Sequence, residues 1–338
     1  MERRKITPLG KYSHVVTLPK EWLNMNNLES GDYVSLDIRD DGVLLMHPYL
    51  EPKEKNNEIT IHINAAEEPD MIQRRIIGCY LNGYDTIILK SGTNFNRQQQ
   101  DSIRSIVRSL YMRIIESHAD QVTLQAFMDE SLASVTSGVE RMHIITSSMG
   151  KDVLKAMKNW DTELAKSVIS LEEDVDQFLF FLTRLLRTAV HNPSLALKLG
   201  VSMGDCFDYH LLVNRIEYVA DCLGDISESL IKLEQHKENV SGEFMDNLYE
   251  VASRIHTYFD QAIDDFMSYS LKHSGEIINY AEDTIAGNEI IETLQYVGKS
   301  EKQVTILCYT IIDNFMRILT YAADIAEITI DRHYVQKQ

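Results

Sequence analysis

Five carboxylate side chains in the second half of the sequence are spaced so that they could bind a metal ion. They form two groups in which successive acids stand four residues apart: Glu172 and Asp176, then Glu217, Asp221 and Asp225. Residues four apart share one face of an α-helix, where like charges repel unless a cation compensates them. Carboxylate oxygens suit Mg, Ca, Mn or Fe ions, and Zn also accepts them. We therefore predict a metal site between two facing helices, with a solvated acidic surface as the alternative.

Basic residues gather at the other end of the chain. The first twenty residues hold one acid, Glu2, and five bases: Arg3, Arg4, Lys5, Lys11 and Lys20. The 338-residue chain carries 33 basic and 51 acidic residues, a net charge of −18, which excludes a protein that coats nucleic acid with its whole surface. A basic tip on an acidic chain predicts an anionic partner at that tip. The alternative is that these charges only keep a strand edge soluble.

Residues 1–50 have the pattern of a small β domain. Apolar and polar residues alternate over 34–38, as in a strand with one buried face. Asp41-Gly42 is typical of a tight hairpin turn, whereas Pro8-Leu9-Gly10 reads as a break between two short strands. Four strands and one helical turn cannot bury enough surface alone. We therefore expect the domain to need a second copy, which makes the protein a homodimer.

One run in this segment carries a family resemblance. Residues 11–22, KYSHVVTLPKEW, followed by Leu28 and Gly31-Asp32, resemble an AbrB/SpoVT-type swapped-hairpin DNA-binding domain. The resemblance implies a dimer with interleaved hairpins whose basic residues contact the phosphates of double-stranded DNA. The residues it implicates are Arg3, Arg4, Lys5, Lys11 and Lys20, with His14 as a lesser candidate. A dimerisation domain that binds no DNA is the alternative.

Residues 51–130 predict a linker followed by a small α/β segment. Strands are expected near 59–63, 86–89 and 122–127, and helices at 69–82 and 96–117. No glycine-rich loop follows a strand, so nothing here indicates nucleotide binding. We interpret this segment as a structural coupler.

Residues 131–338 predict an all-helical domain with an internal repeat. Six apolar-periodic stretches indicate six helices, over 132–158, 161–191, 203–235, 243–272, 277–297 and 301–332. Within this series, residues 215–228 resemble residues 314–327, an offset of 99 residues. A repeat of that length predicts two three-helix bundles in tandem.

The acidic groups give the helical domain a resemblance of its own. Glu172-Glu173-Asp174-Val175-Asp176 and Glu217-Tyr218-Val219-Ala220-Asp221, followed by Asp225-Ile226-Ser227-Glu228, resemble the PhoU family of phosphate-uptake regulators. The resemblance implies metal binding through these motifs and contacts with phosphate transporters or signalling proteins. The second copy carries Met316 and Thr320 on one helix, and Gly287 and Ile291 on the other, at the corresponding positions. These side chains are not metal ligands, so we expect the metal in the first bundle alone.

Three weaker features complete the sequence evidence. Glu140 and His143 form an E-x-x-H motif, but a di-metal carboxylate site needs a second one, which the sequence lacks. His143 is therefore expected to be a packing or surface residue, or a supplement to the first-bundle site. Asp260 and Asp264 are expected to be solvated. Four widely spaced cysteines and no apolar run of membrane-spanning length predict a cytoplasmic protein.

Together these features predict a multi-domain α+β protein with three parts: a swapped-hairpin β domain at 1–50, an α/β coupler at 51–130 and tandem three-helix bundles at 131–338. We expect a DNA-binding transcription regulator of phosphate uptake, not an enzyme, whose helical domain senses metal, phosphate status or a partner. Two alternatives remain: a PhoU-type adaptor that does not bind DNA, and a di-metal carboxylate enzyme.

Overall fold

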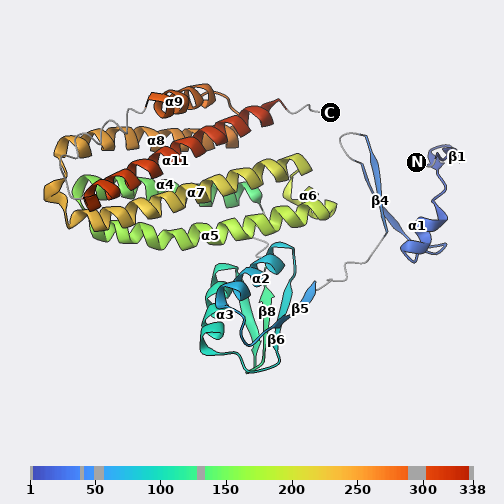
Figure 1. Ribbon diagram of the computed structural model, residues 1–338. Coiled ribbons are helices and arrows are strands. Elements are labelled where there is room, and N and C mark those ends of the chain that lie inside the picture. Colours follow the sequence, from blue (N-terminus) through green and yellow to red (C-terminus); the bar gives the residue numbers. More distant parts are fainter. Residues whose placement is uncertain (1–2, 39–41, 49–56, 128–133, 288–301, 335–338) are drawn as a thin grey trace. The chain divides into compact units, whose positions relative to one another are not determined.

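The computed structural model describes residues 3–38, 42–48, 57–127, 134–287 and 302–334 (Figure 1). The chain divides into two compact units, one containing the described residues up to 48 and the other those from 57 onward. Each unit is described by itself below.

The N-terminal unit consists of two antiparallel strand pairs and a short helix. Its elements are β1 (Thr7–Leu9), β2 (Ser13–Val15), α1 (Lys20–Met25), β3 (Val34–Ile38) and β4 (Leu44–Pro48). β1 pairs with β2 and β3 with β4. The predicted break at Pro8 is wrong, because Pro8 lies within β1 opposite His14, where a two-stranded ribbon tolerates proline. The turn begins instead at Gly10, whose φ of +73° favours glycine.

Among its described side chains, this unit has no buried core of its own. These side chains are exposed or half-buried, and Ile38 on β3 is 81% exposed. Large apolar residues left in water are unfavourable. The unit therefore has the surface of a domain that packs against something else.

The second unit begins with an α/β layer of four strands and two helices. Its elements are β5 (Glu58–Ile63), α2 (Pro69–Leu81), β6 (Thr86–Ser91), α3 (Arg97–Ser109), β7 (Met112–Ser117) and β8 (Gln121–Ala126). The strand order is β5-β6-β8-β7, with β5 parallel to β6 and the other pairs antiparallel. The two helices bury one face of the sheet, around Ile76, Leu89 and Leu124. We call residues 57–127 the coupler.

One predicted helix of the coupler is shorter than expected. The helix predicted over 96–117 ends at Ser109, and residues 112–117 form strand β7. Tyr111 has a φ of +50°, which turns the chain between the two elements. The β-branched Ile114 and Ile115 that follow favour a strand over a helix.

The rest of the unit is helical. Its elements are α4 (Val135–Asn159), α5 (Thr162–His191), α6 (Pro193–Leu199), α7 (Met203–Glu234), the 3₁₀ turn Lys237–Asn239, α8 (Gly242–Ser268), α9 (Ser274–Gly287) and α11 (Lys302–His333). The helices α4, α5 and α7 form the first set, and α8, α9 and α11 the second (Figure 1). All of them share one apolar core. The α+β fold class is confirmed; the end of the predicted helix 277–297 lies outside the described residues.

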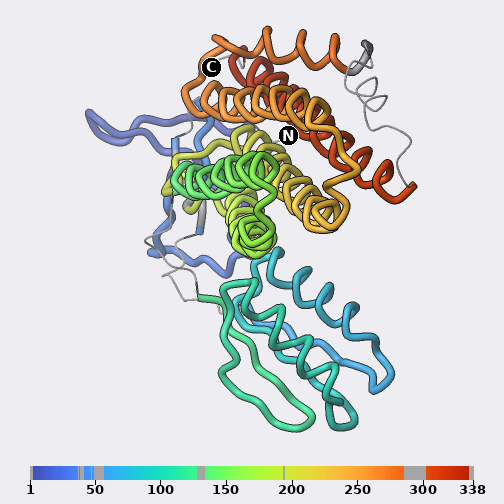
Figure 2. The backbone as a smooth tube through the Cα atoms, turned by 90° about the vertical axis from the view of Figure 1, so that its left-hand side faces the viewer, coloured from blue at the N-terminus to red at the C-terminus, as the bar shows by residue number. Residues whose placement is uncertain are grey.

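A buried arginine joins the coupler to α5. Arg184 is 2% exposed and donates hydrogen bonds to the backbone oxygens of Tyr80 and Tyr84 and, at 2.6 Å, to Asp85 Oδ1. Its guanidinium also lies 4.7 Å from the centre of the Tyr80 ring. Figure 2, which views the long helices nearly end-on, shows the coupler meeting them along one side. Arg184 therefore fixes the coupler to the helix that carries two of the predicted metal ligands.

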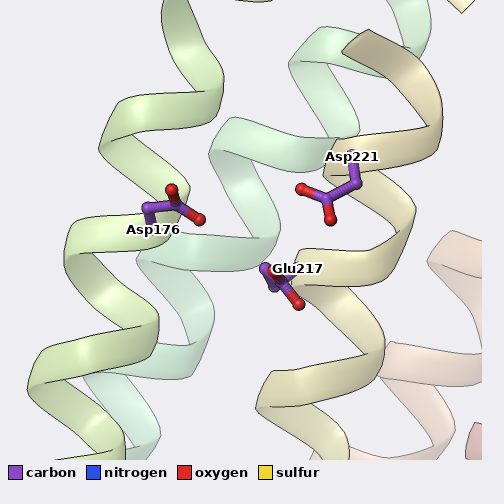
Figure 3. A group of neighbouring side chains, drawn as sticks. All are labelled: Asp176, Glu217 and Asp221. Atoms are coloured by element: carbon purple, nitrogen blue, oxygen red, sulfur yellow. The ribbon is translucent and has the colours of Figure 1, made fainter. Parts of the chain in front are cut away.

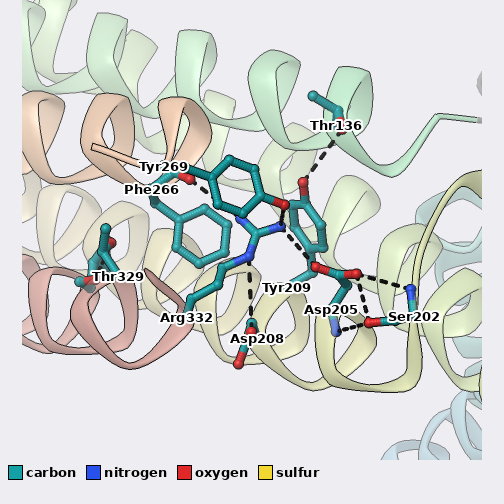
Figure 4. A network of polar contacts seen from close by, with 10 residues as sticks. Thr136, Ser202, Asp205, Asp208, Tyr209, Phe266, Tyr269, Thr329 and Arg332 are labelled. Atoms are coloured by element: carbon teal, nitrogen blue, oxygen red, sulfur yellow. Dashed lines mark hydrogen bonds and ion pairs between the residues drawn. The ribbon is translucent and has the colours of Figure 1, made fainter. Parts of the chain in front are cut away.

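A second buried arginine connects α11 to α7 and α8. The Arg332 guanidinium lies over the rings of Tyr209, Phe266 and Tyr269 and forms an ion pair of 3.0 Å with Asp205 (Figure 4). It also donates to the Tyr269 hydroxyl and to the backbone oxygen of Phe266. The end of α11 is thereby held to both sets of helices. Among the described helices, none is long and apolar enough to cross a bilayer.

Candidate metal centre

The structure brings three of the five predicted acidic ligands together. Asp176 on α5 and Glu217 and Asp221 on α7 can each offer one oxygen, and these three oxygens lie within 4.8 Å of one another. Figure 3 shows the side chains projecting from the two helices into the space between them. We call these three residues the carboxylate cluster. Its helices are close neighbours along their length, which follows from the apolar stripes that both bury in the common core.

Glu172 lies beside this cluster because α7 has a glycine opposite it. A Cβ atom on Gly224 would lie 2.5 Å from Glu172 Oε2, so any other residue at position 224 would displace the Glu172 carboxylate. The sequence analysis missed Gly224. The available signal was a glycine inside a long helix, where glycine costs about 1 kcal/mol relative to alanine. Asp225, the fifth predicted ligand, directly follows Gly224 on α7 and is exposed.

The carboxylates raise one another's pKa values. Burial, followed by the charge of Asp221, raises the pKa of Glu217 to about 8 and that of Glu172 to about 7. The same two causes raise the pKa of Asp176 to about 6. The pKa of Asp221 is also raised, first by burial and then by Asp225, although a hydrogen bond with Glu217 and the charge of Arg317 oppose this. Several half-buried acids lie close together here with little positive charge to offset them. A bound cation would reduce the repulsion between them.

The donor set fits a hard cation. The carboxylate cluster offers oxygen atoms and neither imidazole nor thiolate, a set that suits Mg²⁺, Mn²⁺, Ca²⁺ or iron better than Zn²⁺. Cys222, the neighbour of Asp221, is buried, and burial raises the pKa of its thiol to about 12. Cys222 is not one of the three side chains whose ligand atoms meet in the cluster. Asp176, Glu217 and Asp221 would hold the ion, with Glu172 alongside.

Among the described residues, the corresponding positions of the second set of helices offer no such cluster. Met316 is a thioether, and the Thr320 hydroxyl donates to the backbone oxygen of Met316 within α11. Gly287 is the last residue of α9, and Ile291 lies outside the described residues. The expectation that the metal site belongs to the first set stays a prediction.

His143 is a packing residue, as expected, whereas Asp260 differs from what the sequence suggested. His143 Nε2 lies 2.9 Å from Asp260 Oδ1 on α8, so the structure pairs it with α8 and does not add it to the carboxylate cluster. Asp260 is half-buried in this contact, and the expectation that it is solvated is wrong; Asp264 is exposed as expected. The difference arises because α4 and α8 pack against each other, a contact that spacing within one helix does not reveal.

The five basic residues predicted to contact DNA are all exposed in the N-terminal unit: Arg3, Arg4, Lys5, Lys11 and Lys20. The first three precede β1, Lys11 lies in the turn between β1 and β2, and Lys20 begins α1. The lesser candidate, His14, is exposed on β2. Exposure is what contact with a phosphate backbone requires.

Two parts of the chain match models of known protein families. Residues 139–230 match the model of the PhoU domain, a span that contains all five predicted acidic ligands. Residues 13–58 match the model described as "Antidote-toxin recognition MazE, bacterial antitoxin". The crystal structure of PhoU from Pseudomonas aeruginosa aligns with a TM-score of 0.51 and 16% identity, over 58% of this chain and 93% of that one. At this identity the likeness concerns the fold alone. No curated protein sequence matches the chain.

Proposed function

We propose that this protein is a cytoplasmic, DNA-binding transcription regulator of phosphate uptake in which a PhoU-type helical domain is the sensor. The proposal is supported by the combination of a MazE-like N-terminal match with a PhoU domain in one chain. The observation that carries it is the exposure of all five N-terminal bases in a protein whose net charge is −18. Those bases supply local attraction for a polyanion that the rest of the chain repels.

The same unit supports a homodimer as the DNA-binding form. It leaves large apolar side chains such as Ile6 (68% exposed) and Ile38 in contact with solvent. A second copy of the same unit would cover these residues, and two-fold symmetry would present two basic tips to two half-sites of one duplex.

The helical domain would sense its signal through a hard divalent cation in the carboxylate cluster. An ion there would screen the repulsion between α5 and α7, and α5 is also the helix that Arg184 fixes to the coupler. A change in the packing of α5 would therefore reach the coupler, which follows the N-terminal unit in the chain. The ion can change the affinity for DNA only if the helices have two arrangements and bind the ion more tightly in one of them.

An electrophoretic mobility shift assay with DNA from upstream of the protein's own gene tests this function. We expect a shift at low salt with the full chain, and a different affinity when Mn²⁺ is added. A variant with Glu217→Gln and Asp221→Asn should shift the DNA but lose the response to Mn²⁺. No shift at any salt concentration would contradict the proposal and favour an adaptor that acts on a transporter or a signalling protein.

We propose no catalytic activity. The di-metal enzyme alternative needs a second E-x-x-H motif, which the sequence lacks, and Glu140 of the single motif is exposed. Absence of oxygen consumption by the Mn²⁺- or Fe²⁺-loaded protein is the expected result.

A further inference from the structure

A second cluster of polar side chains connects α4 to α8, away from the residues used above. Asp260 Oδ1 lies 2.9 Å from His143 Nε2, and Asp260 Oδ2 accepts a hydrogen bond of 3.0 Å from the Ser147 hydroxyl. His256 Nε2 lies 3.6 Å from the same Oδ2. The side chains of His143, His256 and Asp260 are 17%, 13% and 27% exposed. Two imidazoles from different helices thus meet one carboxylate in a largely buried place.

His256 is seated there by a glycine and has an unused nitrogen. A Cβ atom on Gly150 would lie 2.6 Å from His256 Nδ1, so α4 accommodates this imidazole only because residue 150 is glycine. His256 Nε2 is buried and makes no hydrogen bond to any residue that the structure describes. A buried polar atom without a partner costs about 1–3 kcal/mol, so the arrangement is explained if Nε2 serves another ligand.

We propose that His256, Asp260 and His143 form a second cation site, which takes a transition-metal ion of the Zn²⁺ or Co²⁺ type between α4 and α8. Ligand atoms about 2.1 Å from a tetrahedral ion lie about 3.3 Å apart, and the two nitrogen–oxygen distances, 2.9 and 3.6 Å, lie on either side of this value. The two imidazoles contact different oxygens, and the set does not yet bring three ligand atoms within 4.8 Å of one another. His143 must therefore exchange its hydrogen bond with Asp260 for the ion.

The two sites would differ in the ion they select. The carboxylate cluster between α5 and α7 offers oxygen atoms only, whereas the α4–α8 site offers two imidazole nitrogens. Imidazole favours zinc, cobalt and copper over magnesium and calcium. An ion at the second site would tie α4 of the first helix set to α8 of the second, and so bind the two halves of the helical domain together.

Electron paramagnetic resonance of Cu²⁺ added to the full-length protein in excess Mg²⁺ tests this site, because nitrogen ligands split the copper signal. We expect nitrogen coupling in the natural protein and in the Glu217→Gln variant, and loss of that coupling in His256→Gln and His143→Gln. Isothermal titration with Zn²⁺ should show one fewer bound zinc ion per chain in the same two variants. Ser147→Ala, which keeps all three ligands, is the matched control and should retain both signals.

The outcomes separate the site from a purely structural role. If the histidine variants fold, as shown by circular dichroism, and keep the nitrogen coupling and the zinc equivalent, the proposal is wrong. If the natural protein itself shows no nitrogen-bound copper and no such equivalent, the cluster is a hydrogen-bonded clamp only, which also overturns it. If His256→Gln does not fold, Gly150→Ala supplies the test, because its Cβ displaces the imidazole without removing a ligand; unchanged zinc affinity there contradicts the site.

Discussion

Glu172 on α5 lies directly against the backbone of α7 at Gly224, where a Cβ atom would lie 2.5 Å from the Glu172 carboxylate. The contact places a further acid beside Asp221, whose charge contributes to the raised pKa of Glu172. Crowded acids of this kind destabilise the fold unless a proton or a metal ion compensates them. The two helices therefore favour a cation between them at the cost of some stability.

Replacing Gly224 with alanine tests this packing. The added Cβ should push Glu172 away from the carboxylate cluster and weaken the binding of Mn²⁺, on the order of tenfold, as loss of a supporting contact does elsewhere. Isothermal titration calorimetry measures the change. Gly204→Ala in the same helix is the control, because a Cβ there meets only Ser202 Oγ, at an ordinary 3.6 Å. Equal affinities in the two variants would show that Glu172 has no part in binding.

The raised pKa values predict how stability depends on pH. Folded Glu217 has a pKa of about 8, well above the ordinary glutamate value of 4.5, so the folded protein holds protons that the unfolded chain releases. The stability from this group is fully present below about pH 4.5 and is lost as the pH rises to about 8, and Glu172 and Asp176 act in the same direction.

In the presence of a chelator, the melting temperature should therefore decrease as the pH rises from 5 to 8. Added Mn²⁺ should reverse the fall, because the ion binds the deprotonated carboxylates. Glu217→Gln should flatten the pH dependence, since it removes the group with the highest of these pKa values. If the melting temperature of this variant decreases with pH as steeply as that of the natural protein, other groups cause the effect.

Arg184 should be essential for the attachment of the coupler. Replacing it with methionine keeps much of its apolar contact but leaves the backbone oxygens of Tyr80 and Tyr84 without their donor. We expect a loss of about 2 kcal/mol in the free energy of unfolding. Hydrogen exchange should rise around α2. Arg187→Met is the control, because its bond to Asn82 is exposed and should contribute less than about 1 kcal/mol.

Arg332→Met should destabilise the helical domain by about 3 kcal/mol, because it leaves Asp205 without its buried partner and removes a cation from three aromatic rings. Chemical denaturation measures the loss. Restoring only the charge with Arg332→Lys should recover a small part of it, since lysine lacks the planar fork that reaches Asp205 and the backbone oxygen of Phe266 together. Full recovery by lysine would contradict this account of the contact.

Much of the helical domain could be predicted from the sequence because long apolar stripes have a clear period. The periodic stretches correspond to α4, α5, α7, α8, α9 and α11, and the spacing of Asp176, Glu217 and Asp221 anticipated a cluster that the structure assembles. Spacing alone did not show which of five acids meet, because that depends on the register between α5 and α7.

The features that the sequence did not reveal are contacts between distant elements. The sequence pattern predicts a helix where strand β7 lies, because Tyr111, which turns the chain with a positive φ, is not a usual turn residue. Gly224 and Gly150 matter because another helix places the side chains of Glu172 and His256 against them. The Asp260 pair with His143 spans more than a hundred residues, beyond the range of any local pattern.

The salt dependence of DNA binding tests the central claim most directly. Fluorescence anisotropy with a labelled duplex from the upstream region would compare the natural protein with Arg4→Ala combined with Lys5→Ala, and with Lys155→Ala on α4 as a control for charge. We predict that the double variant binds more weakly and that its log–log salt slope falls by about 0.9 for each phosphate contact removed, while Lys155→Ala changes neither. Unchanged affinity and slope in the double variant would contradict the assignment of the N-terminal bases to DNA.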